Sequence, residues 1–296
     1  MYIRSRQDKV FSAVAHLVMI IITAFAVLPF LLLISGSFTD NATAIRYGYQ
    51  FWPRAFSLEA YSYIFAQWDM IGRAYGVTML VTVIGTTISL LLASTLGYGL
   101  SQRVPGAKII LFFVLFTMLF NGGIVASYMI YSNVLQIKNT IWALIVPNLL
   151  LNGFTVMLIR SYFVQNVPPE LLEAAEIDGA GQLRIYWKIA LPLSTPIMAT
   201  IGLLSAVSYW NEWTNGLYFI TNPQLYSIQL LLNKINNNIQ FLATKAGEII
   251  GSAGAPLPSV SVRMAIAAVA IVPVIVVYPF FHKYFAKGIT LGGVKG

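Results

Sequence analysis

Six long stretches of the chain contain no aspartate, glutamate, lysine or arginine, and they constrain the fold more than any other feature. They cover residues 10–39, 74–102, 109–137, 139–159, 189–211 and 264–282. A helix needs about 20 apolar residues to cross about 30 Å of hydrocarbon, because each residue adds about 1.5 Å. Only 9% of the residues are charged and 58% are hydrophobic, which is typical of a membrane protein.

The stretches predict an all-α integral membrane protein with six transmembrane helices in a single domain, residues 1–296. The predicted spans are 11–34, 75–100, 109–132, 141–160, 194–220 and 264–282. Long loops are expected over 161–193 on one side and over 35–74 and 221–263 on the other. The first stretch exceeds the apolar part of a signal peptide, about 7 to 15 residues, which favours an uncleaved anchor over a cleaved signal.

The positions of lysine and arginine predict the orientation, because these residues concentrate in cytoplasmic loops. With the N-terminus inside, eleven lie in cytoplasmic segments and seven in the longer external segments. Both termini and the 161–193 loop are therefore expected in the cytoplasm. This bias accounts for most of the net charge of +8, so no nucleic acid partner is implied.

The external loops contain two distinctive segments. Residues 49–65, "YQFWPRAFSLEAYSYIF", carry aromatic side chains that suit a membrane interface. Residues 221–238, "TNPQLYSIQLLLNKINNN", fit a strand poorly and predict a helix lying on the membrane. The following "GEIIGSAGAPLPS", residues 247–259, is either a mobile loop that reaches an external partner or a plain connector.

Several residues within the predicted spans are candidates for packing or for a transport pathway. Ser89, Ala93 and Gly97 recur every four residues, so they place small side chains on one helix face and permit close helix packing. In "NGG", Asn121 either bonds to a neighbouring helix at a kink or lines a pathway.

A second group of candidates lies near the outer end of the fifth predicted span, in the sequence "SYWNEW". Its rings, amide and carboxylate are the groups that sugar sites use, with rings against the apolar sugar face and polar groups on hydroxyls. An interfacial aromatic belt is the alternative. The candidate pathway residues are Tyr209, Trp210, Asn211 and Glu212.

The 161–193 loop contains four of the ten acidic residues within nine positions. Pro168 and Pro169 suit the first turn of a helix, and acidic side chains near that end are stabilised by the helix dipole. Gly179 and Gly181 are expected to allow a sharp turn into a second helix. The loop therefore predicts a helix–turn–helix projection in the cytoplasm, and these features by themselves favour a plain amphipathic connector over a functional element.

The sequence of this loop resembles the "EAA" signature of ABC importer permeases. The matching positions are Glu173, Ala174, Ala175, Gly179, Ile189, Leu191 and Pro192. Outside the loop, "LLLISGSF", "NTIWALIVP", "SYWNEW" and "KGITLGGVKG" resemble the MalG-like permeases of maltose-type carbohydrate importers, so that nearly the whole chain is covered. Ala60 stands where those permeases usually have Asn, and Ala126 where they often have Pro.

The resemblance implies a type I importer fold in a bacterial inner membrane and a division of labour. Two homologous permeases form the pathway, two ATPase subunits bind ATP and Mg²⁺, and an extracellular binding protein delivers a sugar. The coupling helix would sit in a cleft of one ATPase, with Glu173 paired to a basic residue, Asp178 beside it and Gly179 at the turn. The likeness is nearest to oligosaccharide permeases, including those for uronate chains such as alginate.

Other functions have little support in the sequence. No GxxxxGK[ST] phosphate loop is present, so the chain is not the ATPase, and it is expected to bind no cofactor or metal itself, since His16 and His282 are its only histidines. A stand-alone secondary transporter would need ionisable residues deep in its spans, and the six stretches contain no aspartate, glutamate, lysine or arginine. The alternative that the chain is a purely structural membrane subunit is kept as a hypothesis. Copurification without an ATPase partner would identify such a subunit.

Overall fold

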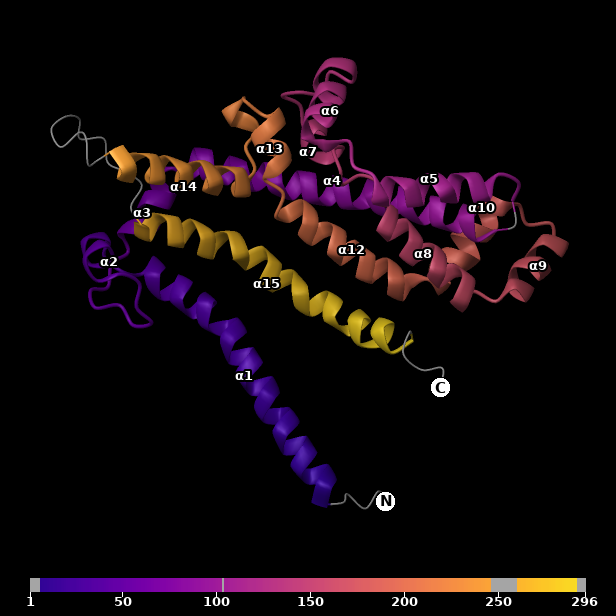
Figure 1. Ribbon diagram of the computed structural model, residues 1–296, viewed down its shortest axis with the longest axis horizontal. Coiled ribbons are helices and arrows are strands. Elements are labelled where there is room, and N and C mark those ends of the chain that lie inside the picture. The colour runs from indigo at the N-terminus through magenta and orange to yellow at the C-terminus, as the bar shows by residue number, and fades with distance from the viewer. Residues whose placement is uncertain (1–5, 103, 246–259, 292–296) are drawn as a thin grey trace. The chain divides into compact units, whose positions relative to one another are not determined.

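The computed structural model describes residues 6–102, 104–245 and 260–291. Within these ranges the regular structure is helical (Figure 1), and the only β-type pairing is an isolated bridge between Thr39 and Phe56. The predicted all-helical class is therefore confirmed. The chain divides into two compact units, one formed by residues 1–68 and 234–272 and the other by residues 69–233 and 273–296.

The helices vary widely in length. Two of them, α1 (Arg6–Ser37, from Lys9 onward) and α4 (Trp68–Ser101), are each long and apolar enough to cross a membrane, and two bent pairs reach that length together. Six spans and the orientation stay predictions. The other helical elements are α2 (Asn41–Tyr47), α3 (Glu59–Ala66), α5 (Ala107–Leu119), α6 (Gly123–Met129), η1 (Ile130–Val134), α7 (Trp142–Ile145), α8 (Gly153–Asn166), α9 (Pro169–Ile177), α10 (Gln182–Ile185), η2 (Tyr186–Ala190), α11 (Leu191–Leu193), α12 (Thr195–Trp210), α13 (Thr214–Phe219), η3 (Pro223–Leu225), α14 (Ile228–Lys245) and α15 (Val260–Leu291).

The first unit contains α1, whose side chains are mostly exposed, and a segment that folds back beside its end. Asp40 N–H donates to the Ala55 carbonyl (3.0 Å), and Ser57 N–H donates to the Phe38 carbonyl (2.8 Å). Asp40 caps α2, and hydrogen bonds from the backbone and hydroxyl of Thr43 lower the pKa of its carboxyl. The Ser261 hydroxyl donates to the Thr39 carbonyl (2.6 Å) and ties the start of α15 to this segment.

The second unit is organised around the small-residue face of α4. Ser89, Ala93 and Gly97 are buried. A Cβ on Gly97 would lie 3.0 Å from Cγ2 of Ile159 and 3.2 Å from the backbone nitrogen of Arg160, so α8 packs directly against this face. The predicted role of these residues in close helix packing is confirmed.

Three of the predicted spans are not straight helices. Around "NGG", α5 and the α6–η1 helix meet at a bend of 120°, because Gly123 adopts a positive φ of 77° and Asn121 accepts a bond from its N–H (2.8 Å). Asn121 thus bonds locally and not to a neighbouring helix. The stretch 141–160 is divided at Asn148, whose φ is 62°, and at the N-cap Asn152. The stretch 194–220 is divided into α12 and α13.

The segment 221–238 contains a helix, as predicted. It begins with the short turn η3 and continues as α14, which extends to Lys245. Contact of this helix with the membrane stays a prediction. The Gly, Ser and Pro segment 247–259 and residues 292–296 of the terminal "KGITLGGVKG" lie outside the described residues.

Candidate functional site

The coupling loop (residues 161–193) contains α9, which starts as its sequence indicates. Pro168 is the N-cap with extended backbone (ψ 127°), and Pro169 takes the first helical position, where a missing N–H costs nothing. Glu170 lies in the first turn, where its charge is favourable to the helix dipole. The sequence therefore fixes the entry into this helix locally.

The end of α9 depends on a glycine. Gly179 has a φ of 78°, a conformation that side-chain-bearing residues adopt at a cost. Its N–H donates to the Glu176 carbonyl (2.9 Å), and the N–H of Ala180 donates to the Ala175 carbonyl (2.9 Å). These two bonds form a Schellman motif with Asp178 as the C-cap. The predicted turn at Gly179 is confirmed.

Gly181 has a different role from the one its sequence suggested. Its backbone is extended (φ −72°, ψ 157°), which any residue can adopt, and it serves as the N-cap of α10. Gly181 therefore lies within the turn, but its conformation does not require a glycine. Gly179 alone supplies the left-handed conformation.

The two faces of the coupling loop differ in exposure. Ala175 and Leu172 pack against the buried core of the second unit. Glu173, Ala174 and Asp178 are exposed. Two large apolar side chains are also exposed, Ile177 at 87% and Leu183 at 77%. The outer face thus combines carboxylates with apolar side chains, a composition suited to a protein partner.

Buried aromatic contacts join η2, the part of the loop that follows α10, to α4. The hydroxyls of Tyr186 and Ser94 are 2.7 Å apart in a buried hydrogen bond. The ring of Tyr98 lies 5.3 Å from that of Tyr186 and 5.5 Å from that of Phe163, between centroids. These contacts join η2, α8 and α4. A displacement of the loop would therefore also displace α4.

The buried hydroxyl pair yields a testable prediction. Tyr186→Phe is expected to lower the free energy of unfolding by about 1 kcal/mol, because it removes one buried hydrogen bond and keeps the ring. Thermal unfolding of the purified protein, combined with Ser94→Ala and the double variant, measures this loss. If the two substitutions are fully additive, the hydrogen bond contributes nothing.

Polar contacts and an open cavity lie at the border between the exposed face of the coupling loop and its packed face. Gln182 donates to the Glu176 carboxylate and accepts from the Tyr98 hydroxyl (3.3 Å). A cavity of about 780 Å³ lies between the end of α4 and the loop, and Glu173 and Glu176 both line it. Glu176 is held by Gln182, whereas Glu173 is left available to a partner.

Ile189, Leu191 and Pro192 lie at an elbow between the coupling loop and α12. The helical run Gln182–Leu193 meets α12 at a bend of 82° around Ser194. Pro192 and Pro196 have no N–H to donate, which favours a break between them. Ile189 and Leu191 pack against the buried core. Ile189 and Leu191 thus anchor the elbow, and the exposed Pro192 favours its break.

At the other end of α12, Tyr209 and Trp210 are buried and not on an open surface. The Tyr209 hydroxyl donates to the Ile145 carbonyl (3.0 Å), and its ring fills the space above Gly85. The ring of Trp210 lies 6.4 Å from that of Tyr75. Within this chain both rings join helices together, and neither forms part of an exposed aromatic belt.

Asn211 and Glu212 lie between α12 and α13. Asn211 is the C-cap of α12, and its amide donates to the Val207 carbonyl (2.9 Å). The Glu212 carboxylate accepts from the N–H of Asn215 (2.7 Å), in the first turn of α13. These four residues of "SYWNEW" are close together, whereas Asn121 lies apart from them in sequence at the α5–α6 break.

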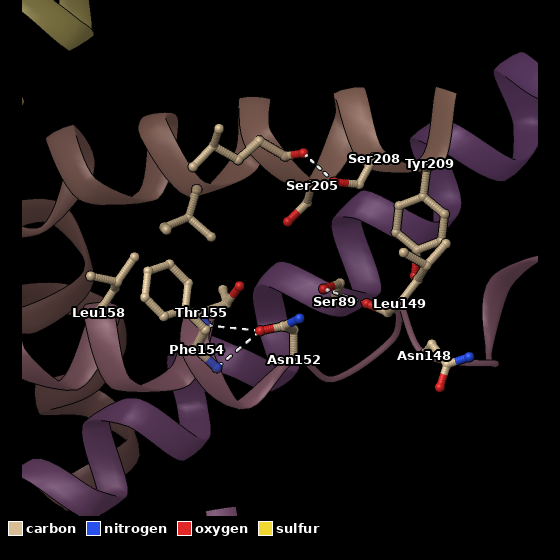
Figure 2. Close-up of a pocket in the computed structure, with 12 residues that line it drawn as sticks. Ser89, Asn148, Leu149, Asn152, Phe154, Thr155, Leu158, Ser205, Ser208 and Tyr209 are labelled. Carbon is tan, nitrogen blue, oxygen red and sulfur yellow. Dashed lines mark hydrogen bonds between the residues drawn. The ribbon is translucent and has the colours of Figure 1, made fainter. Parts of the chain in front are cut away.

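A polar cavity of about 200 Å³ lies beside Tyr209 (Figure 2). Figure 2 shows Ser89 on α4, Asn152 and Thr155 at the start of α8, and Ser205 and Ser208 on α12. Asn152 accepts from the N–H groups of Phe154 (2.9 Å) and Thr155 (3.3 Å), and Ser89 donates to the Leu149 carbonyl (3.3 Å). The cavity therefore offers hydroxyl and amide groups within an otherwise apolar unit.

Of the residues that line this cavity, the sequence indicated only Ser89, as a packing residue, and Tyr209, as a candidate pathway residue. A usable signal existed in the spacing of Ser205 and Ser208, and of Asn152 and Thr155. Pairs three residues apart share one face of a helix. What the spacing could not indicate is that the two faces meet.

Comparison with known proteins extends these findings. The chain is 37% identical to the polygalacturonan/rhamnogalacturonan transport system permease protein YtcP of Bacillus subtilis (strain 168), over 98% of this chain and 100% of that protein. It is 36% identical to protein LplC of the same organism, over 92% and 90%.

A solved structure is also similar, a bacterial ABC transporter involved in the import of the acidic polysaccharide alginate. Its matching chain has 28% sequence identity and a TM-score of 0.80, with 96% of this chain and 100% of that chain covered. Residues 64–291 match the family described as binding-protein-dependent transport system inner membrane component. The loop, its glycine turn and the helices around the polar cavity thus belong to a chain of this family, the membrane permeases of ABC importers.

Proposed function

We propose that this chain is one of two homologous permeases that together form the pathway of an ATP-driven importer for an oligosaccharide. The main support for this proposal is the coupling loop. Its exposed face is available to a partner, and its other face packs against the core that includes α4 and α12. A carbohydrate substrate is supported by the similar protein YtcP, which is named for polygalacturonan and rhamnogalacturonan transport, and by the similar solved transporter, which is involved in alginate import.

In this proposal α9 sits in a cleft of an ATPase subunit. Glu173 pairs with a basic residue there, while Ile177 and Leu183 fill apolar contacts beside it. ATP binding brings the two ATPase subunits together and moves both coupling loops, and the elbow at Ser194 passes the movement to α12. The polar cavity beside Tyr209 lies along α12 and would change shape with it.

The proposal also assigns topology and partners. Six spans place both termini in the cytoplasm of a bacterium, with the chain in the inner membrane as a multi-pass protein. ATP and Mg²⁺ bind to the two ATPase subunits, and an extracellular binding protein delivers the sugar. Asn121, Tyr209, Trp210, Asn211 and Glu212 are proposed to shape the outer part of the pathway by holding the helix breaks.

Affinity purification of the tagged chain from its native membrane tests the proposal. We expect a second permease and an ATPase to copurify, and we expect membranes with the complex to take up oligosaccharides only when ATP is supplied. Uptake driven by an ion gradient without ATP would instead identify a secondary transporter. Purification without any ATPase would identify a structural subunit.

A further inference from the structure

The segment that follows α1 lies beside the last turn of that helix. The Ser35 hydroxyl donates to the Gln50 carbonyl (2.6 Å). A Cβ on Gly36 would lie 3.4 Å from the ring of Tyr49. Residues 46–54 are therefore held at the same level as the end of α1, and this holds within the first unit alone.

The length of α1 gives that level a physical meaning. The apolar run Lys9–Ser37 has 29 residues, which at 1.5 Å each span roughly 43 Å. A bilayer is about 30 Å thick in its hydrocarbon and about 40 to 45 Å with its headgroups. If α1 crosses the membrane, its last turn reaches the headgroup region, and residues 46–54 lie there with it.

The side chains of this segment fit the headgroup region. Phe51 is 58% exposed and Trp52 is 84% exposed. Tyr47 and Tyr49 are exposed as well. Large aromatic side chains left open to solvent are costly in water but are enriched at membrane interfaces, where an apolar ring and a polar edge are both satisfied.

Arginine side chains lie among these rings. The guanidinium carbons of Arg54 and Arg46 are 4.7 and 5.4 Å from the centroid of the Tyr47 ring, so both cations share one ring. Arg54 also donates to the Gln50 side chain (2.9 Å). Both arginines are exposed, and no carboxylate in the described residues pairs with either.

A third arginine approaches from α15. Arg263 donates to the Asn236 side chain (2.6 Å) and to the Tyr49 hydroxyl (3.4 Å), and its Nε has no partner among the described residues. Three arginines thus lie around the rings of Tyr47 and Tyr49. An anionic partner would satisfy the exposed Arg46 and Arg54, because guanidinium groups bind phosphate and carboxylate by two parallel hydrogen bonds.

We propose that the interface cluster, defined as Arg46, Tyr47, Tyr49, Phe51, Trp52 and Arg54, binds the headgroup of an anionic phospholipid. Arg46 and Arg54 bind the phosphate, and the Phe51 and Trp52 rings insert among the acyl chains next to the headgroups. A carboxylated sugar or an acidic protein would satisfy the same arginines. The lipid is favoured because the exposed rings and the level of the segment both match the headgroup region.

Quenching of Trp52 fluorescence by brominated lipids tests this proposal. The complex containing this chain is reconstituted in vesicles made of equal parts phosphatidylcholine and phosphatidylglycerol, with bromine on one lipid or the other. The difference between the wild type and Trp52→Phe isolates the Trp52 signal. We expect stronger quenching by the brominated phosphatidylglycerol, since each arginine should enrich anionic lipid about fivefold.

Matched variants make the result specific. The double variant Arg46→Gln, Arg54→Gln should lose the preference and quench equally with both lipids. Arg73→Gln removes one exposed charge on α4, outside the cluster, and should keep it. Equal quenching in the wild type, or a preference that survives the double variant, would overturn the proposal. So would quenching by neither lipid, combined with a Trp52 response to added oligogalacturonate, which would indicate a soluble anionic sugar.

Discussion

Gly179→Val is expected to reduce substrate-stimulated ATP hydrolysis of the assembled importer at least tenfold. The residue has a φ of 78°, and a side-chain-bearing residue pays about 1 to 2 kcal/mol there. Valine is branched at Cβ and tolerates this region least. The chain would leave the Schellman motif, so α9 would point away from the proposed ATPase cleft. ATP hydrolysis by the purified complex, with and without binding protein and sugar, measures the effect.

Two control substitutions separate backbone conformation from side-chain volume. Gly181→Val introduces the same side chain two residues later, where the backbone is extended and no atom lies within 4 Å of the added Cβ. It should leave hydrolysis close to the wild type. Gly179→Asn should retain most of the wild-type ATP hydrolysis, since asparagine tolerates a positive φ. Equal losses at both glycines would show that the turn is not the reason.

The second large effect is expected at Gly85, on the face of α4 that meets α12. A Cβ there would lie 2.6 Å from two ring atoms of Tyr209, well inside normal contact. Gly85→Ala should therefore destabilise the protein by about 1 to 3 kcal/mol, the usual cost of overpacking a buried site. The midpoint of thermal unfolding in detergent measures this change.

Another glycine of the same helix provides the control. Gly76 has no atom within 4 Å of an added Cβ. Gly76→Ala should be neutral or stabilise by about 0.5 to 1 kcal/mol, because alanine favours a helix over glycine. A Gly85→Ala protein as stable as the wild type would mean that Tyr209 does not occupy this space.

Local features of the sequence predicted much of the fold and of the coupling loop. The all-helical class follows from charge-free stretches, the entry into α9 from Pro168 and Pro169, and its end from Gly179. The first depends on the composition of continuous stretches, and the other two on residues within one turn of one another. The small face of α4 was also predictable, because spacing by four residues indicates a helix face whatever it contacts.

Features that depend on distant contacts were not predictable. The sequence suggested that the Glu212 carboxylate is free for a sugar, yet it accepts from the N–H of Asn215 in the first turn of α13, and the Tyr209 hydroxyl bonds to a carbonyl 64 positions away. The bend at Gly123 and the positive φ of Asn148 divide stretches whose composition alone indicates continuous spans. The polar cavity arises only when α4, α8 and α12 meet, so no single segment indicates it.

The most direct test of the central claim compares Glu173→Ala with Glu170→Ala in the reconstituted importer, with ATP hydrolysis and oligosaccharide uptake measured together. Both carboxylates are exposed on α9, but only Glu173 belongs to the signature. We expect Glu173→Ala to lose stimulated hydrolysis and uptake while the subunits still copurify, and Glu170→Ala to retain both. Normal uptake with Glu173→Ala would contradict the account, because the loop would then be only a connector.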